Sequence, residues 1–264
     1  MAQNSGLSST EDLFDVKGLV AVVTGGGSGI GLMIAKALEN NGAIVYIVSR
    51  QLDKLEDAAQ KHNRYGNLIP HQCDISSQDS ILSLVETVKN RHGYINLLVN
   101  NAGVALNLLP KLPKPTTTPS SSSNGTSESP PLSFTSDQLQ TYQSALWKSS
   151  SPQEFSKTFE INTSAVWYTT IAFLSLLDLG NRKGNMKGLT SQVITISSGG
   201  GFRKDESVFS VSYTLSKAAT THLGKMLAHF LKDWQIRSNV IAPGIFPSRE
   251  YNIHTHLNGS RFLK

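Results

Sequence analysis

Residues 19–31, LVAVVTGGGSGIG, decide how this chain folds. The first five form an unbroken apolar run, which is typical of a strand buried on both faces of a sheet. The glycines that follow permit a sharp turn and let another group approach the backbone closely. Residues 29–41 then repeat apolar side chains at helical spacing. The stretch therefore predicts a buried strand, a tight turn and a helix in succession.

Short apolar runs and helical segments alternate along the rest of the chain. Because strands that alternate with helices need crossover connections, this pattern predicts a parallel sheet. Right-handed crossovers favour a doubly wound, Rossmann-like sheet with the strand order 3-2-1-4-5-6. The predicted fold class is α/β, a doubly wound parallel sheet of six strands in a single domain, 1–264. The further predicted strands are 44–48, 67–72, 95–99, 192–197 and 236–242, and the further predicted helices are 53–62, 79–91, 154–177 and 213–232.

Composition excludes several classes of protein. With 39% hydrophobic residues among 264, the chain can bury a core and is not disordered as a whole. Its one cysteine, Cys73, excludes a disulfide framework, and His254 and His256 have no evident third ligand, so we expect no metal. No apolar run is long enough to cross a membrane and the N-terminus is polar, which predicts a cytoplasmic protein without a membrane contact. The net charge of +5 is spread along the chain, so we expect no nucleic-acid partner.

Residues 110–136 interrupt the alternation of strands and helices. Of these 27 residues, 19 are proline, serine or threonine, so the segment cannot bury enough apolar surface to offset the ordering of its backbone. We predict a disordered surface insertion between the fourth strand and the long helix. A regulatory or docking loop is the alternative.

The turn after the first strand has the pattern T-G-x-x-x-G-x-G, from Thr24 to Gly31. Backbone N–H groups in such a turn, together with the positive end of a helix dipole, suit the pyrophosphate of a dinucleotide. A P-loop is excluded because no Gly-Lys-Ser/Thr follows. The alternative is a flexible turn without a ligand. The predicted cofactor contacts are Gly25, Ser28, Gly29, Ile30 and Gly31.

The second strand ends in Val48-Ser49-Arg50 and has no carboxylate at that point. An acid there would hold the ribose 2′-hydroxyl of NAD. Arg50 could instead pair with a 2′-phosphate, so the sequence favours NADP over NAD. The alternative is that Arg50 is an ordinary surface residue.

Tyr213 and Lys217 are four residues apart in a predicted helix, so both project from one face. A neighbouring cation lowers the pKa of a phenol, which suits the pair to moving a proton while hydride moves between cofactor and substrate. The strand before them ends in Ser197-Ser198, at the carboxyl edge where open α/β sheets bind ligands. Ser198 is the preferred candidate for a hydrogen bond to a substrate carbonyl, and Ser197 is the second choice.

With these motifs the sequence resembles the short-chain dehydrogenase/reductase family, over residues of about 15 to 248 outside the insertion. The segments VYIVSR and NVIAPGIFPS look most like the branch of rhamnolipid-type 3-oxoacyl-carrier-protein reductases. The matching positions are Thr24 to Gly31, Asp74, Asn100 to Gly103, Asn162, Ser198, Tyr213, Lys217, Pro243 and Gly244.

The resemblance implies an NADP-dependent enzyme that interconverts a small-molecule carbonyl and a secondary alcohol. Tyr213 would be the general acid/base, Lys217 would bind the nicotinamide ribose and lower the pKa of the tyrosine, and Ser198 would orient the carbonyl. Asn162 would hold a water in a proton relay, and a homo-oligomer would form through the helices that carry Asn162 and Tyr213. The other implied cofactor contacts are Asp74 at the adenine, Asn101 on the adenosine side, Ser248 near the nicotinamide amide, and Ile75, Ala102, Gly103, Pro243, Gly244 and Phe246.

Two features depart from the family pattern. The gap between Ser198 and Tyr213 is longer than usual, and residues 202–207 can absorb the difference because lengthening a loop costs little entropy. Only 20 residues follow Gly244, and the tail 249–264 is polar, so we expect the family's seventh strand and substrate-covering helices to be missing. A truncated, catalytically inactive relative that binds the cofactor or a partner is the alternative hypothesis.

Overall fold

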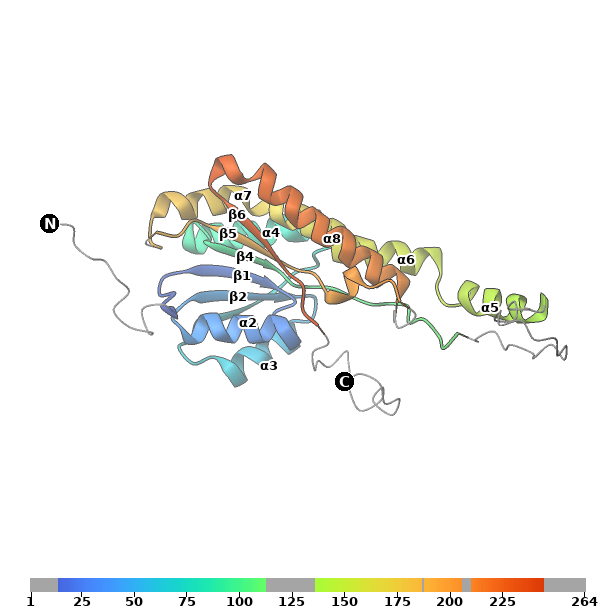
Figure 1. Cartoon of the computed structure of the whole chain (residues 1–264). Coiled ribbons are helices and arrows are strands. Elements are labelled where there is room, and N and C mark those ends of the chain that lie inside the picture. Colours follow the sequence, from blue (N-terminus) through green and yellow to red (C-terminus); the bar gives the residue numbers. More distant parts are fainter. Residues whose placement is uncertain (1–13, 113–135, 187, 206–209, 245–264) are drawn as a thin grey trace, which may run out of the picture.

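The computed structural model describes residues 14–112, 136–186, 188–205 and 210–244, which form a six-stranded sheet between two layers of helices (Figure 1). The strand order β3-β2-β1-β4-β5-β6 confirms the predicted doubly wound, Rossmann-like topology. Every neighbouring pair of strands is parallel. The strands are β1 (Val20–Thr24), β2 (Ile44–Ser49), β3 (Leu68–Gln72), β4 (Leu97–Asn100), β5 (Gln192–Ile196) and β6 (Arg237–Ile241).

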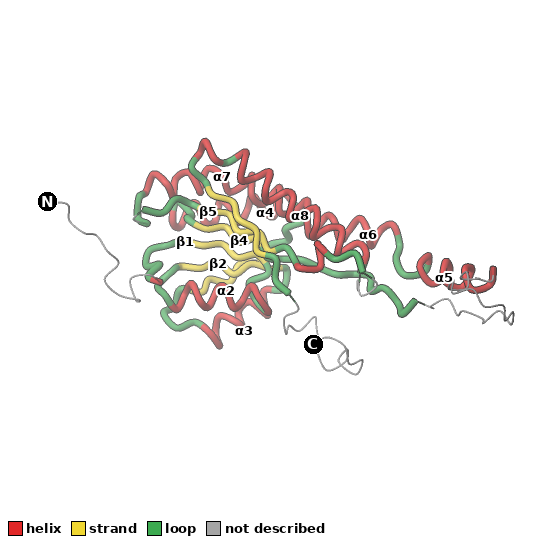
Figure 2. Tube along the Cα trace, viewed as in Figure 1, coloured by secondary structure: helices red, strands yellow, loops and turns green. Residues whose placement is uncertain are grey.

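Each face of the sheet has its own apolar core, and β1 contributes to both. Val20 and Val22 pack on the face that carries α4, α7 and α8, whereas Ala21 and Val23 pack on the face that carries α2 and α3 (Figure 2). This double burial explains why the run 19–23 is apolar without interruption. The helices that cover the two faces are α2 (Gly29–Asn40), α3 (Leu52–His62), α4 (Gln78–His92), α7 (Ala165–Lys183) and α8 (Val211–Phe230).

The single helix predicted over 154–177 is wrong in its interior and at its end. The structure has α6 (Pro152–Phe159), then a π-helical turn, η1 (Glu160–Ser164), and then α7. In this turn the N–H of Ala165 donates to the carbonyl oxygen of Glu160, five residues earlier. The apolar spacing did not reveal it, and the side-chain hydrogen bonds of Asn162 within it join residues far apart in sequence. The helix continues to Lys183, where Gly184 in the left-handed conformation ends it.

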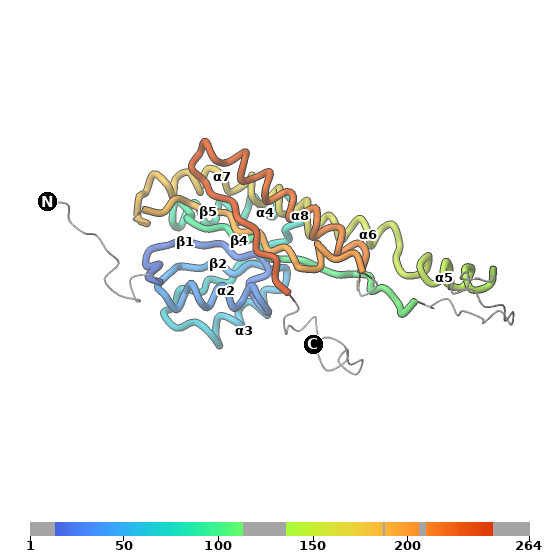
Figure 3. The backbone as a smooth tube through the Cα atoms, in the orientation of Figure 1, coloured from blue at the N-terminus to red at the C-terminus, as the bar shows by residue number. Residues whose placement is uncertain are grey.

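Helix α5 (Ser136–Trp147) was not predicted from the sequence. Its first residue belongs to the predicted insertion, so that prediction is wrong at Ser136, and residues 113–135 lie outside the described part of the chain. No residue of α5 is buried, and the helix extends away from the body of the molecule (Figure 3). Leu139, Tyr142 and Leu146 do recur at helical spacing, which is the signal that could have revealed it.

Strand β6 lies at the edge of the described sheet. Among the described residues it pairs only with β5, and Arg237, Asn239 and Ile241 are exposed. The predicted polar tail lies outside the described residues. Two short helices, η2 (Gly199–Phe202) and η3 (Lys232–Trp234), precede α8 and β6. Each helix in the described ranges is too short or too polar to cross a membrane.

Candidate active site

The turn after β1 has a conformation that glycine alone adopts readily. Gly25 and Gly29 have φ values of 66° and 52°, in the left-handed region. A Cβ atom on Gly31 would lie 2.3 Å from the carbonyl oxygen of Gly25. Helix α2 therefore begins directly against the turn, as a dinucleotide-binding turn requires.

The start of α2 offers N–H groups to an anion. Ser28 occupies the N-cap position, and within the described structure its side chain makes no capping hydrogen bond. The first turn, which includes Ile30, carries no acidic residue. The N–H groups at this end thus retain the partial positive charge that attracts a phosphate. The turn and the helix start fit the pyrophosphate of a dinucleotide.

Thr24 and Asn101 join the ends of β1 and β4. The hydroxyl oxygen of Thr24 accepts hydrogen bonds from the backbone N–H groups of Asn101 (3.0 Å) and Ala102 (3.1 Å). The Nδ2 atom of Asn101 donates to the carbonyl oxygens of Thr24 (3.0 Å) and Gly25 (3.3 Å). Asn101 therefore braces the glycine turn. Thr24 was not predicted as a site residue, although its place between the apolar run and the first glycine was a usable signal.

Arg50 and Asp74 follow the ends of β2 and β3. Arg50 is exposed, and its carbonyl oxygen accepts a hydrogen bond from Gln72 Nε2 (2.9 Å). The carboxylate of Asp74 accepts from the backbone N–H (2.9 Å) and the hydroxyl (2.7 Å) of Ser76. Burial raises the pKa of Asp74, but the hydrogen bonds from Ser76 and the charges of Arg50 and Lys157 outweigh it, so the pKa lies below its usual value. The carboxylate of Asp74 and the guanidinium of Arg50 thus attract each other at this edge of the sheet.

Tyr213 lies in the first turn of α8, and Lys217 lies one turn later on the same face. Lys217 is only 4% exposed, and its Nζ donates to the carbonyl oxygen of Ile196 (2.8 Å). The same nitrogen lies 5.8 Å from the centroid of the Tyr213 ring. A Cβ atom on Gly103 would lie 3.3 Å from Lys217 Nζ and 3.1 Å from Asn162 Oδ1, so the segment after β4 passes beside both.

Ser197 and Ser198 have different surroundings. The hydroxyl of Ser197 is buried and donates to the carbonyl oxygen of Lys217 (2.8 Å). Ser198 is half-buried, and its hydroxyl oxygen accepts from the N–H of Gly200 (3.0 Å). A Cβ atom on Gly200 would lie 3.2 Å from Ser198 Oγ and 3.8 Å from Tyr213 Cε1. Ser198 is therefore the serine on the Tyr213 side, whereas Ser197 bonds the backbone of α8 at Lys217.

Asn162 is fully buried within the π-helical turn η1. Its Oδ1 accepts from the N–H of Val104 (2.8 Å), and its Nδ2 donates to the carbonyl oxygen of Val104 (2.9 Å) and to Ser216 Oγ (2.9 Å). The side chain thus joins the segment after β4 to α8. Wider helical turns of this kind are frequent at functional sites. The predicted water held by Asn162 stays a prediction.

The remaining predicted cofactor residues also follow strand ends. The carbonyl oxygen of Pro243 accepts from the N–H of Gly199 (2.7 Å), which joins the ends of β5 and β6. Ile75 is half-buried after β3, and Gly244 is the last described residue. In the described ranges, no three His, Cys, Asp or Glu side chains gather as a metal site would require. The predicted residues Phe246, Ser248, His254 and His256 lie outside the described part of the chain.

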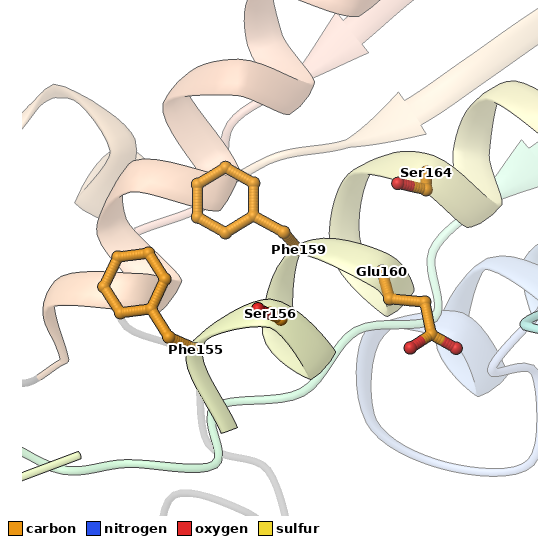
Figure 4. A pocket seen from close by; sticks show the side chains of 5 residues that line it. All are labelled: Phe155, Ser156, Phe159, Glu160 and Ser164. Carbon is orange, nitrogen blue, oxygen red and sulfur yellow. The ribbon is translucent and has the colours of Figure 1, made fainter. Parts of the chain in front are cut away.

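A broad depression lies on α6 and η1, with a volume of about 510 Å³ (Figure 4). The rings of Phe155 and Phe159 stack there, with centroids 5.7 Å apart. None of its lining residues is a predicted site residue; they are Phe155, Ser156, Phe159, Glu160 and Ser164. The candidate active site is therefore the edge where the strands end and not this depression.

Known proteins share both the sequence and the fold. A family model described as short chain dehydrogenase matches residues 19–122 and 142–252. The short-chain dehydrogenase/reductase VdtF of Byssochlamys spectabilis is 42% identical over 255 residues, which cover 90% of this chain and 76% of VdtF. The rhamnolipids biosynthesis 3-oxoacyl-(acyl-carrier-protein) reductase of Pseudomonas aeruginosa is 30% identical over 237 residues, which cover 89% of this chain and 76% of that protein.

A solved structure agrees with these matches. The Pseudomonas aeruginosa RhlG/NADP active-site complex aligns with a TM-score of 0.69 at 28% identity, covering 94% of this chain and 79% of that one. The family resemblance predicted from the glycine turn and the Tyr213/Lys217 pair is confirmed, and a rhamnolipid-type reductase is among the relatives. The chain belongs to the short-chain dehydrogenase/reductase family of oxidoreductases.

Proposed function

We propose that this protein is an NADP-dependent oxidoreductase that interconverts the carbonyl group of a small molecule and a secondary alcohol, with Tyr213 as the general acid/base. The observation that carries the proposal is the buried ammonium of Lys217, 5.8 Å from the centroid of the Tyr213 ring. The pair lies on the helix that packs against the end of β5, and Ser198 is on the side of the tyrosine. A proton-moving group and a carbonyl-orienting hydroxyl are thus close together.

The glycine turn and the start of α2 would hold the cofactor, which supplies or takes up the hydride when bound. Gly25 and Gly31 keep the turn free of side chains, and the helix start provides N–H groups for the pyrophosphate. The exposed Arg50 would pair with the 2′-phosphate of NADP. The NADP named with the RhlG structure supports this preference.

Tyr213 would give its proton to the substrate oxygen as a carbonyl is reduced, and take it back in the reverse direction. The charge of Lys217 favours the phenolate and so lowers the barrier to that transfer at neutral pH. The hydroxyl of Ser198 would donate a hydrogen bond to the same oxygen. Asn162 would fix the segment after β4 against α8 and support the proton relay.

The test is NADPH oxidation with a panel of ketones, followed by absorbance, for the parent protein and for Tyr213→Phe. The parent should turn over, and the variant should lose roughly a hundredfold to ten-thousandfold in kcat while still binding NADPH. Tyr168→Phe, at an exposed position of α7, is the control and should match the parent. Equal rates for Tyr213→Phe and the parent would show that the proposal is wrong.

The cofactor preference has a separate test. Arg50→Ala should raise the KM for NADPH about tenfold, because a charge-assisted hydrogen bond to phosphate is lost, and leave the KM for NADH unchanged. A parent protein that uses both cofactors equally well would contradict the proposed role of Arg50.

A second candidate function is cofactor binding without turnover. It is favoured by the exposure of β6, since one face of the strand that leads to Pro243 and Gly244 is open at Arg237, Asn239 and Ile241. NADPH binding by fluorescence titration, without oxidation of NADPH by any ketone, would favour this candidate. Turnover by the 264-residue chain would dismiss it.

Self-association through the helices that carry Asn162 and Tyr213 is part of the proposal. Ile171 on α7 and Leu215 and Phe230 on α8 are between 40% and 48% exposed, so these helices present apolar side chains that a second copy of the chain could cover. Light scattering should give at least a dimer, and Leu215→Glu should shift it toward the monomer. A monomeric parent protein would contradict this part.

A further inference from the structure

A buried polar group lies where the segment after β4 meets the first turn of α8. Asn107 is 7% exposed, and its Oδ1 accepts hydrogen bonds from the hydroxyls of Ser210 (3.3 Å) and Ser212. Its Nδ2 donates to the hydroxyl of Ser150, just before α6. The Oγ1 of Thr158 on α6 lies 3.4 Å from Ser212 Oγ. One amide thus connects three segments that are far apart in the sequence.

Ser210 in turn fixes the backbone of Tyr213. Ser210 is the N-cap of α8, and its hydroxyl oxygen accepts from the N–H of Tyr213 (3.2 Å). This N–H belongs to the first turn of the helix, where no carbonyl of the same helix can accept it. A serine hydroxyl rotates freely unless a partner orients it. Donation to Asn107 turns the hydroxyl of Ser210 so that a lone pair faces the N–H of Tyr213.

We propose that Asn107 is a positioning residue for the reaction, acting on Tyr213 through Ser210. This inference rests on the proposed role of Tyr213. An amide suits the position because it accepts from two hydroxyls and donates to a third at the same time. Without this amide, the first turn of α8 would lose its hydrogen bonds to the segment after β4. The same segment also bonds Asn162 through the N–H of Val104.

The experiment compares kcat and the KM for NADPH in the parent protein, Asn107→Leu and Asn107→Asp. Asn107→Leu removes every polar partner, so kcat should fall about tenfold, the effect of losing roughly one hydrogen bond in the transition state. The KM for NADPH should not change, because the glycine turn is untouched. Asn107→Asp keeps the acceptor beside the start of α8, where a carboxylate is favourable, and should restore kcat to within about threefold of the parent.

Asn181→Leu is the matched control. Asn181 also joins separate segments, accepting from the N–H of Ser191 (2.6 Å) and donating to the carbonyl oxygen of Gln235 (3.1 Å), but next to the amino ends of β5 and β6. It should lower thermal stability without changing kcat. If Asn181→Leu lowers kcat as much as Asn107→Leu, or if Asn107→Asp is as slow as Asn107→Leu, the inference is overturned.

A second measurement keeps the inference testable if Asn107→Leu folds poorly. Ser210→Ala removes the proposed intermediary and should by itself lower kcat, and Asn107→Ala should lower kcat less in the Ser210→Ala background than in the parent. If the parent protein does not oxidise NADPH, the proposed function is wrong, but the connection from Asn107 through Ser210 to Tyr213 can still be tested. In that case the exchange rate of the Tyr213 amide hydrogen decides, since Asn107→Asp should preserve it and Ser210→Ala should raise it. An unchanged rate in Ser210→Ala overturns the inference.

Discussion

The half of the sheet that carries the glycine turn differs in construction from the half that carries Tyr213. In the first half, the buried residues of α2 and α3 are small or apolar except for Glu39. In the second half, α8 buries three threonines, two serines and a lysine against its neighbours. The buried polar residues of α8 are Ser212, Thr214, Ser216, Lys217, Thr220 and Thr221.

This difference separates two ways of fixing a site. The glycine turn is shaped by backbone conformation and by the absence of side chains, and the side chains of Thr24 and Asn101 supply its few hydrogen bonds. The Tyr213 region depends on hydrogen bonds whose partners come from β5, η1 and the segment after β4. We therefore expect substitutions in the first half to act on cofactor binding and those in the second half to act on kcat.

The largest effect is expected at Lys217, in the half of the sheet that carries Tyr213. Lys217→Met removes the charge that favours the phenolate and leaves the carbonyl oxygen of Ile196 without its donor. We expect kcat to fall by roughly a hundredfold or more, with the optimum of kcat moved to higher pH, because the pKa of Tyr213 loses a charge partner. Lys225→Met, on an exposed position of α8, is the control. A kcat–pH profile equal to that of the parent would contradict the prediction.

In the half that carries the glycine turn, the largest effect is expected at Gly31. A Cβ there would lie 2.3 Å from Gly25 O and 2.4 Å from Asn101 Nδ2, so Gly31→Ala must push α2 away from the turn. We expect a loss of roughly 1–3 kcal/mol in the free energy of unfolding and a loss of affinity for NADPH of about tenfold or more. Denaturant titration and fluorescence binding measure the two effects. Met33→Ala, on the exposed side of the same helix, should leave both nearly unchanged.

The two adjacent serines sharpen the comparison within one strand end. Ser198→Ala should lower kcat about tenfold, because the proposed hydrogen bond from Ser198 to the substrate oxygen would be lost in the transition state. Ser197→Ala should instead lower the free energy of unfolding by about 1–2 kcal/mol, because the buried carbonyl oxygen of Lys217 and the hydroxyl of Thr221 each lose one of their hydrogen-bond partners. Kinetics and thermal unfolding of both variants decide. The reverse assignment of the two effects would contradict the geometry at Gly200.

The smallest effect is expected at Asp74. Its pKa is lowered in the folded protein, so its contribution to stability is fully present above the unfolded value of 3.8 and is lost as the pH falls through the folded value. Below about pH 4, the melting temperature of the parent should fall more steeply with decreasing pH than that of Asp74→Asn. Ser76→Ala, which removes the donor hydroxyl, should lie between the two. Parallel curves for all three would show that this carboxyl does not contribute.

The parts of the site predicted from the sequence are those with local signals. The glycine pattern, the spacing of Tyr213 and Lys217 and the absence of an acid after Val48 are readable within a few residues. The preference for Ser198 over Ser197 has no such local signal, because both follow the same strand and only their hydrogen-bond partners differ. Asn107 has no local signal of its own, since an asparagine in an irregular segment has no periodicity to distinguish it.

The sequence alone determined the strand order, the family and the backbone of the glycine turn. These follow from apolar periodicity, crossover handedness and glycine conformation, which act between near neighbours in the chain. The tertiary structure alone decided how Asn162 is bonded within its π-helical turn and the connection from Asn107 to Ser210. The physical reason is the range of the interactions. Hydrogen bonds such as those from Asn162 to Ser216 and from Ser210 to Asn107 join residues more than fifty positions apart, so their partners exist only after the segments have packed together.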